Sequence, residues 1–290
     1  MMSSVTRCFC VVPRTRCGSA AIGAILTLMA LFRTKPGDYR VVDTDRGKAL
    51  VVPHKVHDAF DERILGLGKV DAACAPCDAI CAVFDLEGFT TFCSGIDPEL
   101  SVPAFMSRFL GWLFLKIKDE TTAQSGLDVG VVLFNPLPFF AKFMGDGVML
   151  LWDAKRLNDE AAFNVALTTA NVCHAYKQYY APEMRREFSN APKRLRAGVA
   201  RGRVIPVGNG TDFVGPCINL AARLQKIVPG VSWCMSQRGF SLKACDAATQ
   251  ARLVLKEVSV RGVGNNELVY VALSEYADVK EQDRSAFRDV

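Results

Sequence analysis

Residues 139–152 (FFAKFMGDGVMLLW) consist of two largely apolar segments around Gly145-Asp146-Gly147. An Asp-Gly dipeptide between apolar runs is a strong signal for a tight β-hairpin. We therefore predict two adjacent antiparallel strands over 139–152, with a carboxylate at their tip. The first constraint on the fold is thus a sheet that contains antiparallel strands.

The chain from residue 80 onward alternates apolar strands with amphipathic helices. A short amphipathic helix is also expected at 54–66. The sequence predicts further strands at 80–84, 194–207, 212–214, 231–236, 255–260 and 267–272, and helices at 102–118, 160–180, 216–228 and 241–252. This order predicts one α+β domain, with an antiparallel-rich sheet flanked by helices. We place this domain at 51–275, between an N-terminal extension (1–50) and a C-terminal tail (276–290).

The net charge argues against a nucleic-acid-binding protein. The chain carries a formal charge of +5, and residues 1–40 already hold six basic residues against one acidic residue. The rest of the chain is therefore neutral. A nucleic-acid surface needs clustered Lys and Arg, so we expect no nucleic-acid partner.

The cysteines indicate a reducing compartment. The chain has 11 scattered cysteines, an odd number, which is typical of reduced thiols rather than of a disulfide framework. We therefore expect a cytoplasmic protein. Cys74 and Cys77 have a CxxC spacing, but a zinc site needs four ligands, so two thiols in a turn are the favoured interpretation.

Residues 19–32 (SAAIGAILTLMALF) form an apolar run of 14 residues. Spanning a bilayer takes about 20 residues, and no A-x-A-like cleavage site follows the run. We instead expect an extension without a structural role, and Met29 is a candidate initiator that would exclude 1–28. The intact mass of the natively expressed protein tests this hypothesis.

Two aspartates are candidates for metal binding. Asp85 follows the apolar strand 80–84 in the segment FDLEGFT, and Asp146 lies at the hairpin tip. Aspartates on adjacent strand ends can clamp two divalent ions about 4 Å apart, and hard oxygen ligands suit Mg²⁺ or Mn²⁺. We expect both carboxylates to be partly exposed. The alternative is that each aspartate only caps a turn.

A third candidate group lies in the predicted helix 216–228. Asn219 and Arg223 stand four residues apart in the segment INLAAR, so they share one helix face and can converge on one ligand. The alternative is an ordinary solvated face.

Taken in this order and at these spacings, the segments FDLEGFT, MGDG and INLAAR resemble those of the class III adenylate and guanylate cyclases, over about residues 81–270. The resemblance implies that Asp85, Asp146 and the backbone carbonyl of Leu86 hold two Mn²⁺ or Mg²⁺ ions. It implies that Asn219 and Arg223 stabilise the transition state for cyclisation of a nucleoside triphosphate.

The same resemblance implies further nucleotide contacts and a dimer. Arg203 and Arg261 match positions that hold the triphosphate, and Lys142 and Asp212 match the pair that recognises the base. Phe89, in the segment FDLEGFT, is also expected to bind the nucleotide. The family's sites form between two chains. A chain with one copy of each motif is therefore expected to form a homodimer with two composite sites.

A closer similarity concerns the base. The segments FDLEGFTTF, PAFMSRFLGWLF, LPFFAKFMGDGVMLLW and DFVGPCINLAARLQ are similar to the standalone bacterial pyrimidine cyclases of Pycsar-type antiphage defence. This similarity implies a cyclic UMP or cyclic CMP product that activates a separate effector. The donor Lys142 and the acceptor Asp212 fit adenine, uracil and cytosine alike. We rank UTP first, CTP second and ATP third. Bulky Phe143, Met144 and Phe213 either narrow the base pocket or belong to the core.

Two hypotheses of other classes remain at this point. The chain could be an inactive cyclase-like module that binds nucleotide and regulates a partner, but intact Asp85, Asp146, Asn219 and Arg223 argue against it. It could also be a polymerase-like nucleotidyltransferase, since such enzymes share paired carboxylates. The neutral domain, without a basic channel for a strand, argues against that class.

Overall fold

The computed structural model describes residues 40–44, 47–51, 53–55, 65–67, 71, 74–127, 130–208, 210–227 and 229–290. The chain divides into two compact units, residues 1–70 and 71–290. In the first unit, β1 (Arg40–Thr44) and β2 (Gly47–Val51) form an antiparallel hairpin. Most of the expected helix at 54–66 lies outside the described residues.

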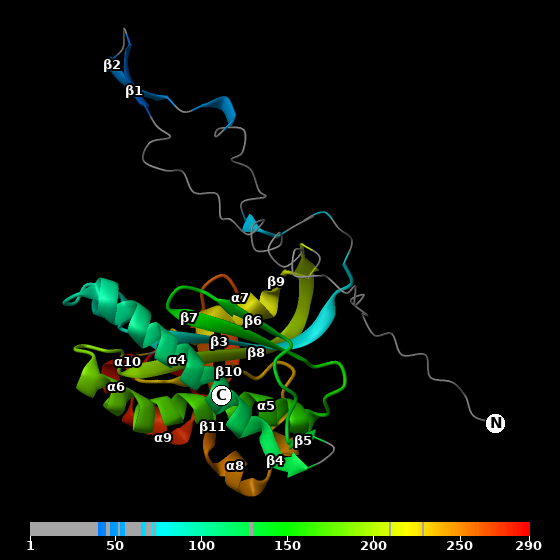
Figure 1. The fold of residues 1–290 in the computed structure, drawn as a ribbon. Helices are drawn as coiled ribbons and strands as arrows, with labels where there is room; N and C mark the ends of the chain where they lie inside the picture. Colours follow the sequence, from blue (N-terminus) through cyan, green and yellow to red (C-terminus); the bar gives the residue numbers. More distant parts are fainter. Residues whose placement is uncertain are drawn as a thin grey trace. The chain divides into compact units, whose positions relative to one another are not determined.

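The second unit is built on a nine-stranded sheet (Figure 1). The strand order is β13-β11-β12-β10-β8-β3-β7-β6, and β9 pairs with β8. All pairings are antiparallel except that of β8 with β10. The strands are β3 (Cys77–Glu87), β6 (Phe140–Phe143), β7 (Gly147–Asp153), β8 (Arg194–Val207), β9 (Asp212–Val214), β10 (Trp233–Ser236), β11 (Leu253–Val260), β12 (Gly264–Ala272) and β13 (Phe287–Arg288).

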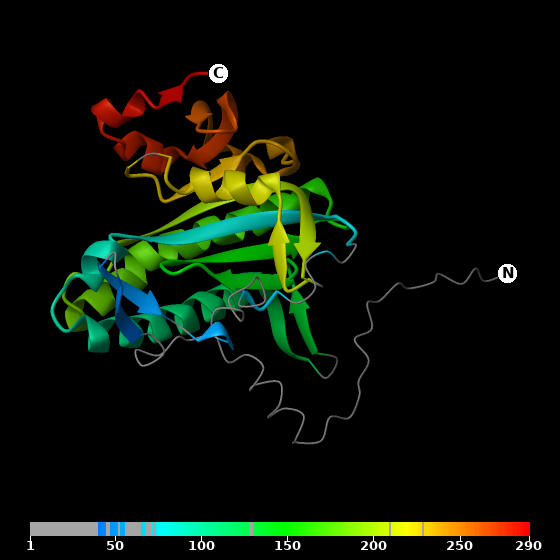
Figure 2. The same cartoon turned by 90° about the horizontal axis from the view of Figure 1, so that it is seen from above.

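Helices cover both faces of this sheet. The described helices are α3 (Phe89–Cys93), α4 (Pro98–Thr121), α5 (Asp159–Ala175), α6 (Ala181–Glu187), α7 (Pro216–Leu224), α8 (Ala247–Ala251), α9 (Leu273–Asp278) and α10 (Glu281–Arg284). Figure 2 shows α7, in yellow, on one side of β3 and α4, in green, on the other. The fold is thus α+β with a mostly antiparallel sheet between helices, as predicted.

Side chains of β3 alternate between two hydrophobic cores, because successive residues of a strand point to opposite faces. Ile80 and Phe84 pack in the core under α4 and α5. Cys81 and Val83 pack in the core under α7. Asp85 continues the second series, so its carboxylate points to the α7 face of the sheet.

The structure departs from several predicted boundaries. The helix predicted at 160–180 is α5 followed by a π-helical turn, Tyr176–Tyr180, and α6 then continues the chain. The helix predicted at 241–252 is a 3-10 turn, Leu242–Ala244, followed by α8. The hairpin of β4 (Thr122–Leu127) and β5 (Gly130–Leu133) was not predicted, since its sequence lacks clear alternation.

The C-terminal residues add a strand to the edge of the sheet. β13 pairs with β11, and Phe287 is buried against Tyr276 at a ring distance of 5.4 Å. Lys256 pairs with Asp289 and lies 4.3 Å from the centre of the Tyr276 ring. These contacts fix residues 276–290 on the domain.

Candidate functional site

The sheet brings Asp85 and Asp146 together, as predicted. Asp85 on β3 stands directly opposite Gly147 on β7, and Asp146 immediately precedes that glycine. The Leu86 amide donates to the Asp146 carbonyl at 3.1 Å, which ties the hairpin tip to β3. A side chain at Gly147 would overlap the Phe84 carbonyl, so this close approach requires glycine.

Asp85 is more buried than the sequence suggested. Its side chain is 6% exposed, and each carboxylate oxygen forms an ion pair with a basic side chain of the same chain. Arg196, its cross-strand neighbour on β8, donates to Oδ2, and the Lys226 ammonium lies 3.1 Å from Oδ1. The expectation of a partly exposed carboxylate was therefore wrong for Asp85, because α7 and β8 cover this end of β3.

Asp146 differs from Asp85 in its surroundings. It is half-buried in the β6–β7 turn, where Gly145 adopts a left-handed φ of 91°. Its carboxylate forms no ion pair with any residue in the described part of the chain. Of the two candidate ligands, Asp85 is thus neutralised by basic side chains, whereas Asp146 is not neutralised by any described residue.

These donors fit a hard divalent cation. The described residues contain no cluster of three or more His, Cys, Asp or Glu, so a thiolate and imidazole site of the zinc type is absent from them. Two neighbouring carboxylates remain, and Asp85 already attracts two positive charges. Oxygen donors of this kind suit Mg²⁺ or Mn²⁺, which keep further positions for phosphate oxygens and water.

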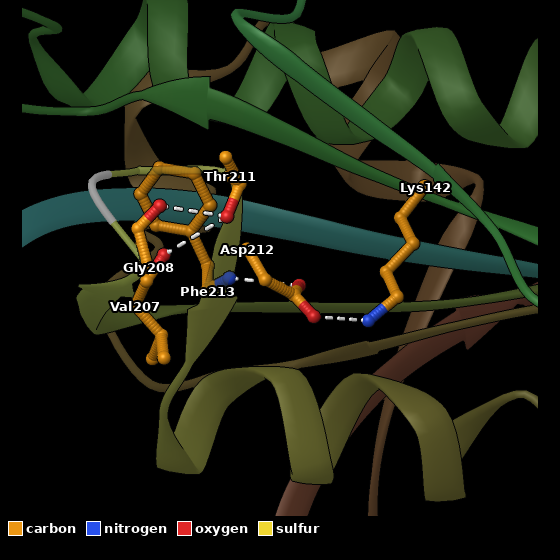
Figure 3. A network of polar contacts seen from close by, with 6 residues as sticks. All are labelled: Lys142, Val207, Gly208, Thr211, Asp212 and Phe213. Atoms are coloured by element: carbon orange, nitrogen blue, oxygen red, sulfur yellow. Dashed lines mark hydrogen bonds and ion pairs between the residues drawn. The ribbon is translucent and has the colours of Figure 1, made fainter. Parts of the chain in front are cut away.

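The second predicted pair also meets. Lys142 on β6 and Asp212 on β9 form an ion pair between their side chains (Figure 3). The other oxygen of Asp212 accepts the Phe213 amide at 2.8 Å. Left-handed backbone at Gly208 (φ 58°) and Gly210 (φ 84°) turns the chain between β8 and β9 and so places Asp212 over β6.

The bulky residues around Lys142 separate into two groups. Phe213 packs edge to face on Phe139 and Phe140, with ring centres 5.5 and 4.8 Å apart, and so belongs to the core under the hairpin. Phe143 is 54% exposed and Met144 is 40% exposed. Phe143 points to the other face of β6 from Lys142, because the two residues are adjacent in a strand.

Helix α7 presents Asn219 and Arg223 to solvent, while its opposite face packs on the sheet. The Arg223 guanidinium donates to the carbonyl of Arg261 in the β11–β12 turn. Gly262 in this turn has a left-handed φ of 71°, and a side chain there would lie 2.7 Å from Arg223 Nη1. The turn and α7 therefore hold each other in place.

The remaining predicted residues lie on β8, β3 and α3. Arg203 is exposed on β8, and its carbonyl accepts a weak hydrogen bond from the Cys217 thiol at 3.6 Å. Leu86 is buried. Phe89 begins α3 and is half-buried, with its ring 6.0 Å from that of Phe92.

The thiols between α7 and the sheet are not suited to nucleophilic chemistry. Burial raises the pKa of Cys217 to about 11. Burial also raises the pKa of Cys81, which lies in the same core. Both thiols therefore stay protonated at neutral pH, whereas a nucleophile needs the thiolate.

The candidate residues form three groups within one chain. These are the aspartate pair, the Lys142–Asp212 pair and Arg223 with the Arg261 turn. Among the described residues, no hydrogen bond or ion pair joins one group to another. The sequence did not predict Arg196 and Lys226 as partners of Asp85, because opposite charges suggest such pairs only when the strand register and the helix packing are known.

No family model matches the sequence, and no curated protein matches it. Solved structures do match the fold. The guanylyl cyclase Cya2 has a TM-score of 0.51 and 18% identity, over 72% of this chain and 96% of that chain. A bacterial light-regulated adenylyl cyclase has a TM-score of 0.50 and 18% identity, over 79% of this chain but only 63% of that chain. The chain therefore has the fold of the class III adenylyl and guanylyl cyclase catalytic domains.

Proposed function

We propose that the protein is a nucleotidyl cyclase, which converts a nucleoside triphosphate to a 3′,5′-cyclic monophosphate and pyrophosphate. One observation supports this most directly: two carboxylates, Asp85 and Asp146, meet at the ends of neighbouring strands in a fold of this class. Arg223 and Asn219 on the solvent face of α7 add groups suited to a phosphate and a ribose.

In this proposal Asp85 and Asp146 hold the divalent cations, which when bound neutralise phosphate charge and acidify the ribose 3′-hydroxyl. The 3′-hydroxyl gives up its proton to solvent and its oxygen attacks the α-phosphorus in line. The bond between the α-phosphorus and the oxygen that bridges to the β-phosphate breaks, so pyrophosphate leaves with that electron pair. Arg223 stabilises the charge that develops on the α-phosphate. Asn219 orients the ribose.

The remaining basic residues, Arg203 and Arg261, are suited to bind the pyrophosphate that leaves. Arg203 and Arg261 are exposed near the two ends of α7 and carry permanent positive charge. In this proposal they bind the β- and γ-phosphates. In the same proposal the half-buried Phe89, at the start of α3, contacts the nucleotide.

We also propose a homodimer with two composite sites. Within one chain no polar contact among the described residues joins the aspartate pair to Arg223 or to Lys142 and Asp212. In each composite site, one copy supplies the aspartate pair and the second copy supplies Arg223. Exposed apolar side chains around β6 and β9 offer a surface for it: Phe139, Phe143, Met144, Ile205 and Val214.

The base assignment rests on Lys142 and Asp212. Asp212 already accepts from Lys142 and from the Phe213 amide, and a carboxylate has lone pairs left for one more donor. We propose UTP as the substrate, with N3–H of uracil donating to Asp212 and a carbonyl accepting from Lys142; CTP and then ATP are the alternatives. Support comes from the similarity to pyrimidine cyclases.

That similarity also suggests the biological role. We propose a cytoplasmic synthase of cyclic UMP that activates a separate effector in antiphage defence. The alternative function is that of an inactive module that only binds nucleotide. Such a module would not need all four of the residues Asp85, Asp146, Asn219 and Arg223.

The test is incubation of the purified protein with Mn²⁺ and an equimolar mixture of ATP, GTP, CTP and UTP, with products identified by mass. Cyclic UMP should dominate. Cyclic AMP as the main product would overturn the UTP assignment and keep the cyclase, whereas no cyclic product under any metal condition would overturn the cyclase. As a finer probe, 3-methyl-UTP lacks the donor to Asp212 and should react at least about tenfold more slowly than UTP.

A further inference from the structure

Lys226 is a positively charged side chain bound to a carboxylate that is proposed to hold a metal. It follows the last turn of α7, three residues after Arg223, and its ammonium lies 3.1 Å from Asp85 Oδ1. Its side chain is 56% exposed, in contrast to the 6% of Asp85. The lysine therefore reaches from solvent to a buried oxygen.

Arg196 holds the other oxygen of the same carboxylate in a different way. Its side chain is 18% exposed, and it stands in direct cross-strand register with Asp85. Its Nε is buried without a hydrogen-bond partner among the described residues. The Arg196 guanidinium is thus confined by burial on the sheet, whereas the Lys226 ammonium lies at the end of a half-exposed, flexible side chain.

The charges at this position cancel. Asp85 and Asp146 supply two negative charges, and Arg196 and Lys226 supply two positive ones. A divalent cation approaching Asp85 thus finds both oxygens occupied and little net negative charge. A metal ion that binds Asp85 is repelled by both neighbouring positive charges, and the half-exposed lysine can move away without opening the sheet.

We propose that Lys226 occupies Oδ1 of Asp85 in the nucleotide-free protein and lowers the affinity of Asp85 for divalent cations. This inference rests on the proposed metal role of Asp85. Lys226 acts through Asp85 as a positioning residue. When a nucleotide binds, its triphosphate offers the ammonium another anionic partner, so the protein binds metal and nucleotide together rather than metal first.

The test measures Mn²⁺ binding to the nucleotide-free full-length protein, from the free Mn²⁺ signal in electron paramagnetic resonance. Lys226→Met keeps the length of the side chain and removes its charge. It should bind Mn²⁺ about three- to tenfold more tightly than the wild type, a range suited to a half-exposed pair. Lys226→Arg keeps the charge and should stay close to the wild type.

Lys243→Met is the matched control, because Lys243 is exposed in the 3-10 turn Leu242–Ala244 and forms no ion pair within the part of the chain that the structure describes. Asp85→Asn identifies the binding that depends on Asp85. If Mn²⁺ binds through Asp85 with equal affinity in the wild type and Lys226→Met, the inference on Lys226 is wrong and the metal role of Asp85 stands. If no binding depends on Asp85 in any variant, both are wrong.

Discussion

Gly198 on β8 lies directly beneath Ala221 on α7, with no room for a side chain between the strand and the helix. A Cβ at Gly198 would overlap the Ala221 carbonyl and lie 2.6 Å from the Gln225 amide nitrogen. Helix α7 carries Asn219 and Arg223 on its other side. The position of both side chains therefore depends on a glycine in the sheet below them.

Gly198→Ala should lift α7 from β8. We expect a loss of about 1–3 kcal/mol in the free energy of unfolding from overpacking, together with a large fall in cyclase activity. Urea denaturation and product formation measure the two effects. Gly111→Ala is the control, because Gly111 is exposed on α4 with nothing near its missing Cβ; alanine there should be neutral or slightly stabilising.

Asp85→Ala and Asp146→Ala should both abolish metal-dependent cyclisation but should differ in stability. Removing Asp85 leaves the largely buried Arg196 without its carboxylate, which should cost about 1–3 kcal/mol. Asp146 forms no ion pair with a described residue, and its loss should change the free energy of unfolding by about 0.5 kcal/mol or less. Urea denaturation in EDTA compares the two. Equal losses of stability would contradict the ion-pair arrangement at Asp85.

Mixing inactive Asp85→Ala with inactive Arg223→Ala should restore part of the activity. A heterodimer of the two variants has one composite site in which both halves are intact, so mixtures should approach about a quarter of wild-type activity at equal concentrations. Product formation is measured after subunit exchange has been verified with differently tagged chains. A mixture that exchanges subunits yet stays inactive would indicate sites contained within one chain.

The buried thiols should make the fold sensitive to alkaline pH. The pKa of Cys217 rises from 9.0 to about 11 on folding, because burial disfavours the thiolate. A group whose pKa is higher in the folded state contributes full stability below pH 9, and that contribution is lost as the pH rises toward 11. Above pH 9 each such thiol should lower the free energy of unfolding by up to about 1.4 kcal/mol per pH unit.

Thermal unfolding measured between pH 7.5 and 10.5 tests whether stability falls as the pH rises. Cys217→Ala should show a shallower decline of stability with pH than the wild type, whatever its stability at pH 7.5. The remaining decline comes from other buried thiols, such as Cys81 and Cys234. An unchanged slope in Cys217→Ala would show that this thiol does not titrate on unfolding.

The sequence alone determined the elements with strong local signals. The strands at 194–207 and 212–214 and the hairpin around Asp146 agree with β8, β9 and the β6–β7 pair, because alternation and Gly-containing turns act over a few residues. Helix ends were less accurate: the helix predicted at 216–228 ends at Leu224. The next residues form tighter bonds, from the Lys226 amide to the Arg223 carbonyl and from the Ile227 amide to the Leu224 carbonyl, as is common at helix ends.

Only the tertiary structure decided which charges meet. Asp212 reaches Lys142 across 70 residues, and Arg196 reaches Asp85 across 111. Each contact depends on the register of strands that are far apart in sequence, and a shift of one residue would turn either side chain to the opposite face. The sequence therefore predicted Asp85 as a metal ligand, while the fold determined that Arg196 and Lys226 form ion pairs with it.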